Sequence, residues 1–128
     1  EAFDRAVLVH LKERRIDFIV LAGYMRLFSS HFTRSYPNKI LNIHPALLPA
    51  FKGTHGIRDA FQYGVKVTGA TVHFVVEAMD AGAIILQEAV AVSSKDTEAS
   101  LARKIHRVEH RIYPKAIDLF ARGKLKLT

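Results

Sequence analysis

A polar pair, Asn42 and His44, interrupts an apolar run and has the types and spacing needed for chemistry. Side chains two apart in a strand project from the same face, so the pair should point together just where Pro45 ends regular pairing. The amide is an uncharged hydrogen-bond donor, and histidine is the side chain whose unperturbed pKa allows proton exchange near neutral pH. Asp80, in a downstream Asp-Ala-Gly turn, adds a carboxylate that favours a charged imidazole. An amide aimed at a developing oxyanion, an imidazole and a carboxylate together predict an acyl-transfer site.

Each of these three residues also has a purely structural interpretation. His44 could be a buried strand histidine satisfied by backbone groups. Asn42 could close a turn through its side chain, and Asp80 is of a type common in turns for local reasons. Residue type and spacing therefore leave both interpretations open.

Three longer segments resemble one enzyme family. They are LNIHPALLPAFKG from Leu41 to Gly53, TVHFVVEAMDAGAIILQ from Thr71 to Gln87 and VEHRIYP from Val108 to Pro114. Together they resemble the phosphoribosylglycinamide formyltransferases, folate-dependent enzymes of purine synthesis, and the resemblance covers nearly the whole chain. The segment around Glu109 and His110 is more similar to these enzymes than to formyltetrahydrofolate deformylase or methionyl-tRNA formyltransferase.

The resemblance implies catalytic roles for four residues. His44 would be the general acid and base and a donor to the formyl oxygen, and Asn42 would be the second partner of the oxyanion. Asp80 would pair with His44, directly or through water. His73 would support the catalytic group, although alone it is typical of a packed strand histidine.

The resemblance also implies ligand contacts. One wall of a folate pocket would be formed by Met25, Arg26, Leu27 and Phe28, and the other by Val76, Glu77 and Asp80. Glu109 would bind the hydroxyls or the amine of the ribonucleotide. Each contact has a structural alternative. Residues 25–28 could simply begin a helix, and Glu109 could be a solvated carboxylate on a helix.

The implied reaction is transfer of the formyl group of 10-formyltetrahydrofolate, a consumed cosubstrate, to the amine of glycinamide ribonucleotide. Hydrolysis of the same folate would use the same three catalytic residues, and a non-catalytic folate-binding module is a further alternative. The family's N-terminal portion, with its first strand and phosphate-holding loop, has no match here. We therefore expect residues 1–128 to be a single catalytic domain that resembles the C-terminal two-thirds of the family.

Composition narrows the classes of partner. The 128 residues fit one domain, and 49% hydrophobic content is enough for one core. Charged residues interrupt every apolar run before the roughly 20 residues of a membrane span. The chain has no cysteine and hence no thiolate chemistry, which fits a cytoplasmic location. The histidines lack the spacing of a metal site, so we expect no metal.

The charge of +7, from 19 basic and 12 acidic residues, indicates either a solvated basic surface or anionic small ligands. The basic residues are spread along helical segments without interleaved aromatics, so we expect no nucleic acid partner. The oligomeric state is left open.

The elements that must position these residues alternate between helices and buried strands, which predicts an α/β fold. By resemblance it is a Rossmann-like formyltransferase fold with a mostly parallel sheet flanked by helices. The expected elements are a helix over 2–14, a strand over 18–23, a short helix from Ser29 or Ser30 to Ser35, a strand over 39–44, a helix over 57–63 ended by Gly64, strands over 70–76 and 84–92, a long helix from a cap at Asp96 or Thr97 to Arg122 with Pro114 as a potential disturbance, and a last short strand after Gly123.

Overall fold

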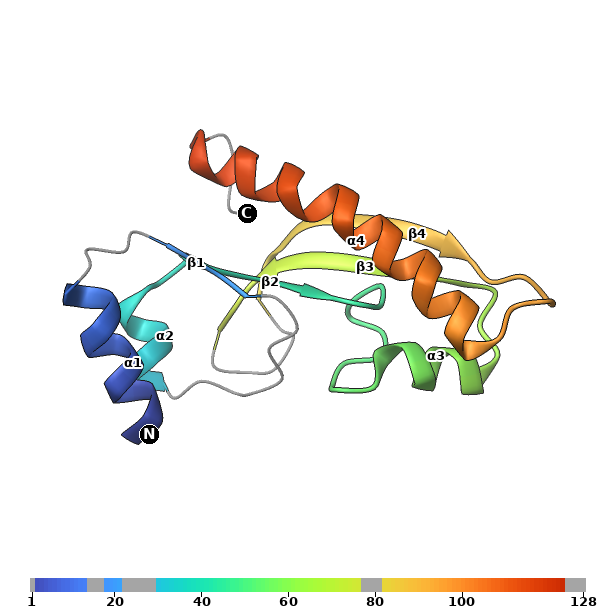
Figure 1. The fold of residues 1–128 in the computed structure, drawn as a ribbon, viewed down its shortest axis with the longest axis horizontal. Coiled ribbons are helices and arrows are strands. Elements are labelled where there is room, and N and C mark those ends of the chain that lie inside the picture. The colour runs from blue at the N-terminus through green and yellow to red at the C-terminus, as the bar shows by residue number, and fades with distance from the viewer. Residues whose placement is uncertain (1, 14–17, 22–29, 77–81, 124–128) are drawn as a thin grey trace.

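The computed structural model describes residues 2–13, 18–21, 30–76 and 82–123, which form a sheet with helices around it (Figure 1). The elements in chain order are α1 (Ala2–Glu13), β1 (Ile19–Val20), α2 (Ser30–Ser35), β2 (Ile40–His44), α3 (Gly56–Tyr63), β3 (Val67–Phe74), β4 (Ile84–Ala91) and α4 (Glu98–Ala121). The predicted α/β class is confirmed.

The sheet has the order β1-β2-β3-β4 and is mixed. Strands β1 and β2 are parallel, whereas β2–β3 and β3–β4 are antiparallel. The expectation of a mostly parallel sheet is therefore wrong for the described strands. The reason lies in the connections: residues 45–66 return the chain to the end of the sheet where β2 finished, and residues 75–83 are too few for the helical crossover that a parallel pair needs.

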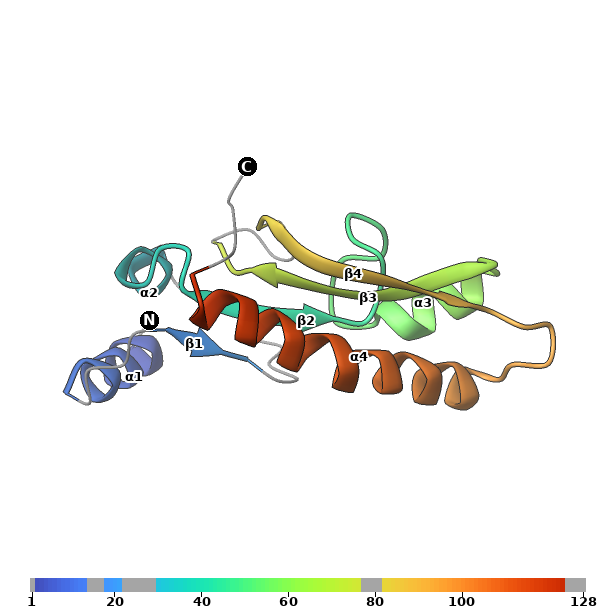
Figure 2. The same cartoon turned by 90° about the horizontal axis from the view of Figure 1, so that it is seen from above.

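Helix α4 covers one face of the sheet along much of its length (Figure 2). Alternate apolar side chains of the strands, among them Ala70, Val72 and Val90, form one core cluster with Leu101 and Ile105 of α4. Each large aliphatic side chain buried in this way stabilises the fold by about 1.5–3 kcal/mol. Because neighbouring residues on a strand project to opposite faces, the residues between these apolar positions face away from α4.

The boundaries of two elements differ from those expected. Strand β3 begins at Val67 rather than at residue 70, because its first residues pair with the end of β4. Gly69 permits this close pairing, since a Cβ atom there would lie 2.1 Å from the carbonyl oxygen of Glu88. The expected strand over 18–23 is described only as far as Leu21, and the expected last strand lies outside the described residues.

Helix α4 continues through Pro114 to Ala121, so the potential break there does not end the helix. The side chain of Tyr113, on α4, reaches the sheet. Its phenol donates to the carbonyl oxygens of Leu21 and Leu41. Burial raises the pKa of this phenol above its ordinary value. The contact joins α4 to β2 directly beside Asn42.

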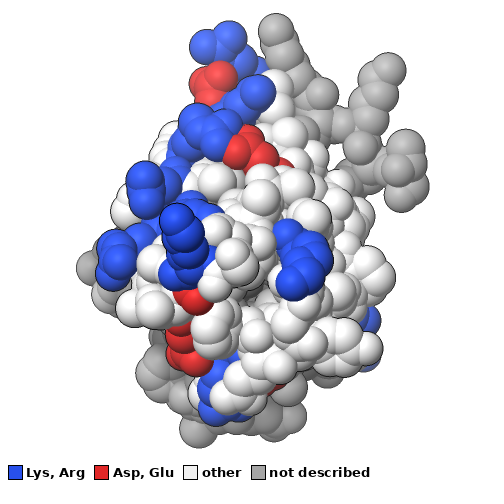
Figure 3. Space-filling model, turned by 90° about the vertical axis from the view of Figure 1, so that its right-hand side faces the viewer, with Lys and Arg blue, Asp and Glu red and all other residues white. Residues whose placement is uncertain are grey.

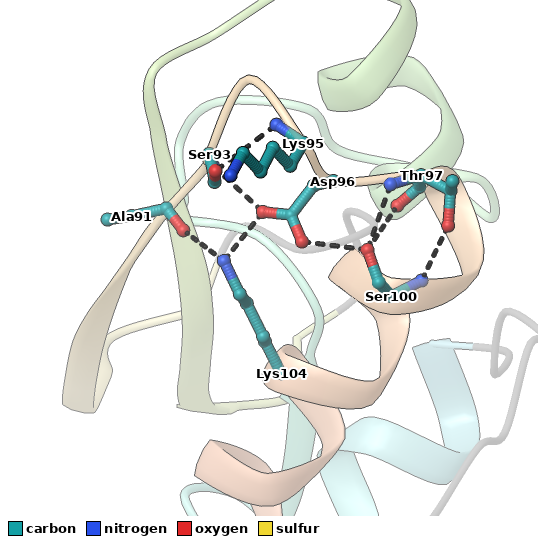
Figure 4. Close-up of polar contacts among 7 residues, drawn as sticks. All are labelled: Ala91, Ser93, Lys95, Asp96, Thr97, Ser100 and Lys104. Atoms are coloured by element: carbon teal, nitrogen blue, oxygen red, sulfur yellow. Dashed lines mark hydrogen bonds and ion pairs between the residues drawn. The ribbon is translucent and has the colours of Figure 1, made fainter.

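The start of α4 is held by a cluster of polar contacts (Figure 4). Thr97 is the N-cap: its hydroxyl accepts the N–H of Ser100, and the Ser100 hydroxyl accepts the N–H of Thr97. Asp96 precedes the cap, and its carboxylate accepts hydrogen bonds from Lys104 (2.6 Å), the Ser100 hydroxyl (2.7 Å) and the N–H of Ser93 (2.8 Å). These three donors, Lys104 foremost, lower the pKa of Asp96 from 3.8 to about 2.

The cluster predicts a stability change in acid. A carboxyl with a lowered pKa in the folded state contributes stability that is present above its unfolded pKa and is lost as pH falls through the folded value. For Asp96 the loss should fall between about pH 4 and pH 2. Urea unfolding of the parent and of Asp96→Asn across this range should show a steeper loss in the parent, with Asp118→Asn on the exposed surface behaving as the parent does. Parallel curves for the parent and Asp96→Asn would contradict this assignment.

Candidate active site

Four polar side chains share the face of the sheet that points away from α4. In the register of β2 and β3, Asn42 lies opposite His73 and His44 lies opposite Thr71. Ile43, between Asn42 and His44 on β2, packs into the core on the α4 side. The predicted common face of Asn42 and His44 is therefore present, and the strand pairing brings His73 beside them.

The His44 ring is buried, with 4% of the residue exposed. Its Nε2 atom lies 2.7 Å from the carbonyl oxygen of Phe51. Because a carbonyl oxygen can only accept, Nε2 carries a proton in this arrangement. The Phe51 carbonyl thereby fixes the orientation of the imidazole ring.

His73 is oriented the other way round. It is 2% exposed, and its Nδ1 atom lies 2.9 Å from the carbonyl oxygen of Phe74. Nδ1 must therefore be the protonated nitrogen of this ring when it is neutral. The two histidines on this face thus donate to backbone carbonyl oxygens through different nitrogens.

Asn42 has the feature most suggestive of a ligand. Its Oδ1 atom is buried and has no hydrogen-bond partner among the described residues. Leaving such an acceptor unsatisfied costs about 1–3 kcal/mol. A substrate group that meets the amide would remove this cost, which favours a binding role over a local turn role.

The loop after His44 is fixed by two side chains that the sequence did not single out for a role. The Thr71 hydroxyl donates to the carbonyl of Ala46 (2.7 Å) and accepts the N–H of Leu48 (3.1 Å). The Gln87 amide, on β4, donates to the carbonyl of Leu48 (2.8 Å) and to the Thr71 hydroxyl (3.0 Å). Thr71 could have been found as the same-face neighbour of His73, but Gln87 emerges only from the β3–β4 register.

The far end of this loop contains an unusual backbone conformation. Phe51 has φ of 52°, in the left-handed region that costs a non-glycine residue about 1–2 kcal/mol. Its carbonyl oxygen accepts a hydrogen bond from Nε2 of His44, and its ring makes an edge contact with Tyr63 at 5.9 Å between centroids. The strained residue is therefore the one that orients the imidazole, as is common at functional sites.

The remaining predicted site residues are only partly described. Asp80, Glu77 and the four residues Met25, Arg26, Leu27 and Phe28 lie outside the described residues. Val76 is 40% exposed just beyond the end of β3.

Glu109 is described, and it lies on α4, the helix on the opposite face of the sheet from Asn42. Its carboxylate lies 2.6 Å from Nδ1 of His106, and its side chain is only 14% exposed. The structure therefore does not place Glu109 in contact with Asn42 or His44.

The described part of the chain contains no group of three or more His, Asp or Glu side chains that could hold a metal ion. Nor does any of its helices combine the length and the apolar character needed to cross a membrane. Figure 3 shows one end of the molecule, where Lys and Arg side chains alternate with acidic and uncharged surface.

The sequence profile of the formyl transferase family matches residues 1–117. The chain belongs to the formyl transferase family. The chain is 50% identical over 125 residues to the trifunctional purine biosynthetic protein adenosine-3 of Homo sapiens. It is 46% identical over 116 residues to the phosphoribosylglycinamide formyltransferase of Bacillus subtilis. These alignments cover 98% and 91% of the chain but only 12% and 60% of the relatives.

Solved structures give the same picture. Glycinamide ribonucleotide transformylase 1 from Symbiobacterium toebii has a TM-score of 0.95 and 52% identity, covering 99% of this formyl transferase and 60% of that chain. A formyltetrahydrofolate deformylase from Pseudomonas syringae has a TM-score of 0.94 but only 31% identity, covering all of this chain and 43% of the other. The chain therefore spans about 60% of the bacterial transformylases that it matches.

The hydrogen bonds of the two histidines predict opposite tautomers. At a pH where both rings are neutral, His44 should carry its proton on Nε2 and His73 on Nδ1, because each of these atoms faces a carbonyl oxygen. Long-range proton–nitrogen NMR of histidine-labelled protein reads the two states directly, and His73 serves as the internal control. Protonation of His44 on Nδ1 instead would contradict the geometry of the site.

Proposed function

We propose that this chain carries the catalytic part of a phosphoribosylglycinamide formyltransferase. The proposed reaction transfers the formyl group of 10-formyltetrahydrofolate to the amine of glycinamide ribonucleotide. The observation that carries the proposal is the shared face of Asn42 and His44. The buried Asn42 Oδ1 has no partner among the described residues, and as an acceptor it suits an N–H of the attacking amine, while the amide N–H suits the oxyanion. The higher identity to the transformylases than to the deformylase supports the choice of acceptor.

In the proposed mechanism the amine nitrogen attacks the formyl carbon, and the carbonyl electrons move onto oxygen. The amide N–H of Asn42 and the protonated Nδ1 of His44 donate to this oxyanion. Collapse of the intermediate breaks the bond between the formyl carbon and the folate nitrogen, so tetrahydrofolate leaves. The proton lost by the amine reaches the leaving nitrogen through Asp80 and water.

Orientation of the two substrates supplies much of the rate, since a well-placed intramolecular attack is worth about 7–11 kcal/mol. Burial of His44 strengthens its hydrogen bond to the oxyanion because little water competes for it. His73, opposite Asn42 in the register, is assigned the supporting role on β3.

The proposed folate pocket consists of Met25, Arg26, Leu27, Phe28, Val76, Glu77 and Asp80. The exposure of Val76, an apolar side chain next to the end of β3, supports the assignment of this pocket. We assign Glu109 to the ribonucleotide. Its Oε1 atom contacts Nδ1 of His106 on the same helix, and a carboxylate has a second oxygen that can accept a hydrogen bond from the ligand.

A cytoplasmic location and small-molecule partners, without a metal or a nucleic acid, complete the proposal. Two rivals share the site. In a deformylase, water replaces the amine and formate is released without ribonucleotide. In a binding module, folate binds with no turnover.

One assay separates these three functions. The protein that contains this chain is given 10-formyltetrahydrofolate with and without glycinamide ribonucleotide, and both formate and formylated ribonucleotide are measured. A transferase gives formylated ribonucleotide and releases little formate when the acceptor is absent. Formate release at the same rate with and without the ribonucleotide would establish a deformylase. Folate binding with neither product would establish a binding module.

The oxyanion assignment predicts the behaviour of Asn42→Ala. Loss of one oxyanion donor typically lowers kcat by about 10²–10³-fold, whereas folate affinity should stay within a few-fold because the amide serves the transition state. His44→Ala should act in the same way. Steady-state kinetics with calorimetric folate binding checks both, and Gln62→Ala on the exposed surface of α3 is the control. A kcat within tenfold of the parent for both site variants would remove the proposed site.

The role of Asp80 as a proton relay predicts the behaviour of Asp80→Asn. The amide is nearly isosteric with the carboxylate, so folate binding should survive. Because an amide cannot take up the proton of the attacking amine, transfer should fall by orders of magnitude. Steady-state kinetics with calorimetric folate binding checks this, and Asp59→Asn on α3 should behave as the parent does. A parental rate in Asp80→Asn would leave Asp80 as a turn residue.

A further inference from the structure

The segment that follows His44 is attached to the sheet through Thr71 and Gln87. Four hydrogen bonds converge here: two from the Gln87 amide, one from the Thr71 hydroxyl to Ala46 and one from the N–H of Leu48 to that hydroxyl. Leu48 is 5% exposed, and Thr71 has no exposed surface. Water therefore cannot easily replace these bonds.

The hydrogen-bonding capacity of the Thr71 hydroxyl is fully used. A hydroxyl has one donor and two acceptor positions. The donor goes to Ala46, and the acceptors take the N–H of Leu48 and one N–H of Gln87. The other N–H of the Gln87 amide goes to the carbonyl of Leu48. Gln87 thus completes a closed network that a side chain without N–H donors cannot reproduce.

This network lies between the two attachments of the His44 ring. The backbone of His44 is paired with Thr71 in the sheet, and its Nε2 atom is held by the carbonyl of Phe51 seven residues later. The segment between them passes through Ala46 and Leu48, which the network fixes. Movement of this segment would shift the Phe51 carbonyl, whose left-handed conformation needs support from its surroundings.

We propose that Gln87 is a positioning residue for formyl transfer. Through Thr71 and Leu48 it fixes the loop that aims the His44 imidazole, although it lies on β4, two strands from β2. This inference rests on the proposed function of His44. It assigns to Gln87 an effect on the chemical step rather than on folate binding or folding alone.

The test replaces Gln87 with Met, which keeps side-chain length and removes both N–H donors. A misplacement of about 1 Å at a reacting group can cost about 100-fold in rate, so kcat should fall by about tenfold to 100-fold. The KM for folate should stay within about threefold. The NMR signals of the His44 ring should shift, while those of His73 should not. Gln62→Met, on the exposed surface of α3, is the matched control and should leave all these values at parental levels.

The hydroxyl at position 71 gives a second, independent pair of variants. Thr71→Ser keeps the donor and both acceptors and should retain kcat within about threefold, whereas Thr71→Val removes them and should reproduce the loss in Gln87→Met. Parental kcat with unshifted His44 signals in Gln87→Met would overturn the inference. So would equal losses in Thr71→Ser and Thr71→Val.

The proposed function and the positioning role fail in different ways. If the parent transfers no formyl group, the function is wrong, yet the His44 ring signals still report whether Gln87 holds the imidazole. If the parent transfers but Gln87→Met matches it in kcat and in the His44 signals, only the positioning role is wrong.

Discussion

The register between β2 and β3 is the constraint on which the site depends. Side chains alternate along a strand, so a slip of one residue would turn Asn42 and His44 toward α4 and bring Ile43 onto the polar face. The core prevents this slip, because Ile43 and Val72 are opposite one another and both pack on the α4 side. Apolar burial on one face thus decides which polar groups meet on the other.

The same register supplies the imidazole with its surroundings. It places Thr71 opposite His44, and Thr71 with Gln87 fixes the segment that ends at Phe51. The carbonyl of Phe51 then accepts a hydrogen bond from Nε2 and fixes the orientation of the ring. The orientation of the His44 ring therefore depends on the β2–β3 register and on side-chain hydrogen bonds from β3 and β4 to one loop.

The sequence predicted local features well and spatial ones less well. The shared face of Asn42 and His44 follows from strand alternation, and the end of α3 at Gly64 follows from its left-handed φ of 84°. Strand direction was wrong for the described sheet, since apolar runs do not encode whether a neighbour is parallel. The role of Gln87 was invisible because its partner Leu48 is 39 residues away. Likewise, no helical pattern near Glu109 indicates the sheet face on which α4 packs.

The proposed function places the reacting formyl group on the face of the sheet that carries Asn42 and His44. A crystal structure of the protein that contains this chain, bound to glycinamide ribonucleotide and a folate whose formyl group cannot be transferred, would show where this group lies. The formyl oxygen should lie within about 2.7–3.1 Å of the Asn42 amide nitrogen and of His44 Nδ1. A formyl group bound out of reach of both atoms, or a formyl group in contact with Nε2 of His44, would show that the reaction does not occur on this face as proposed.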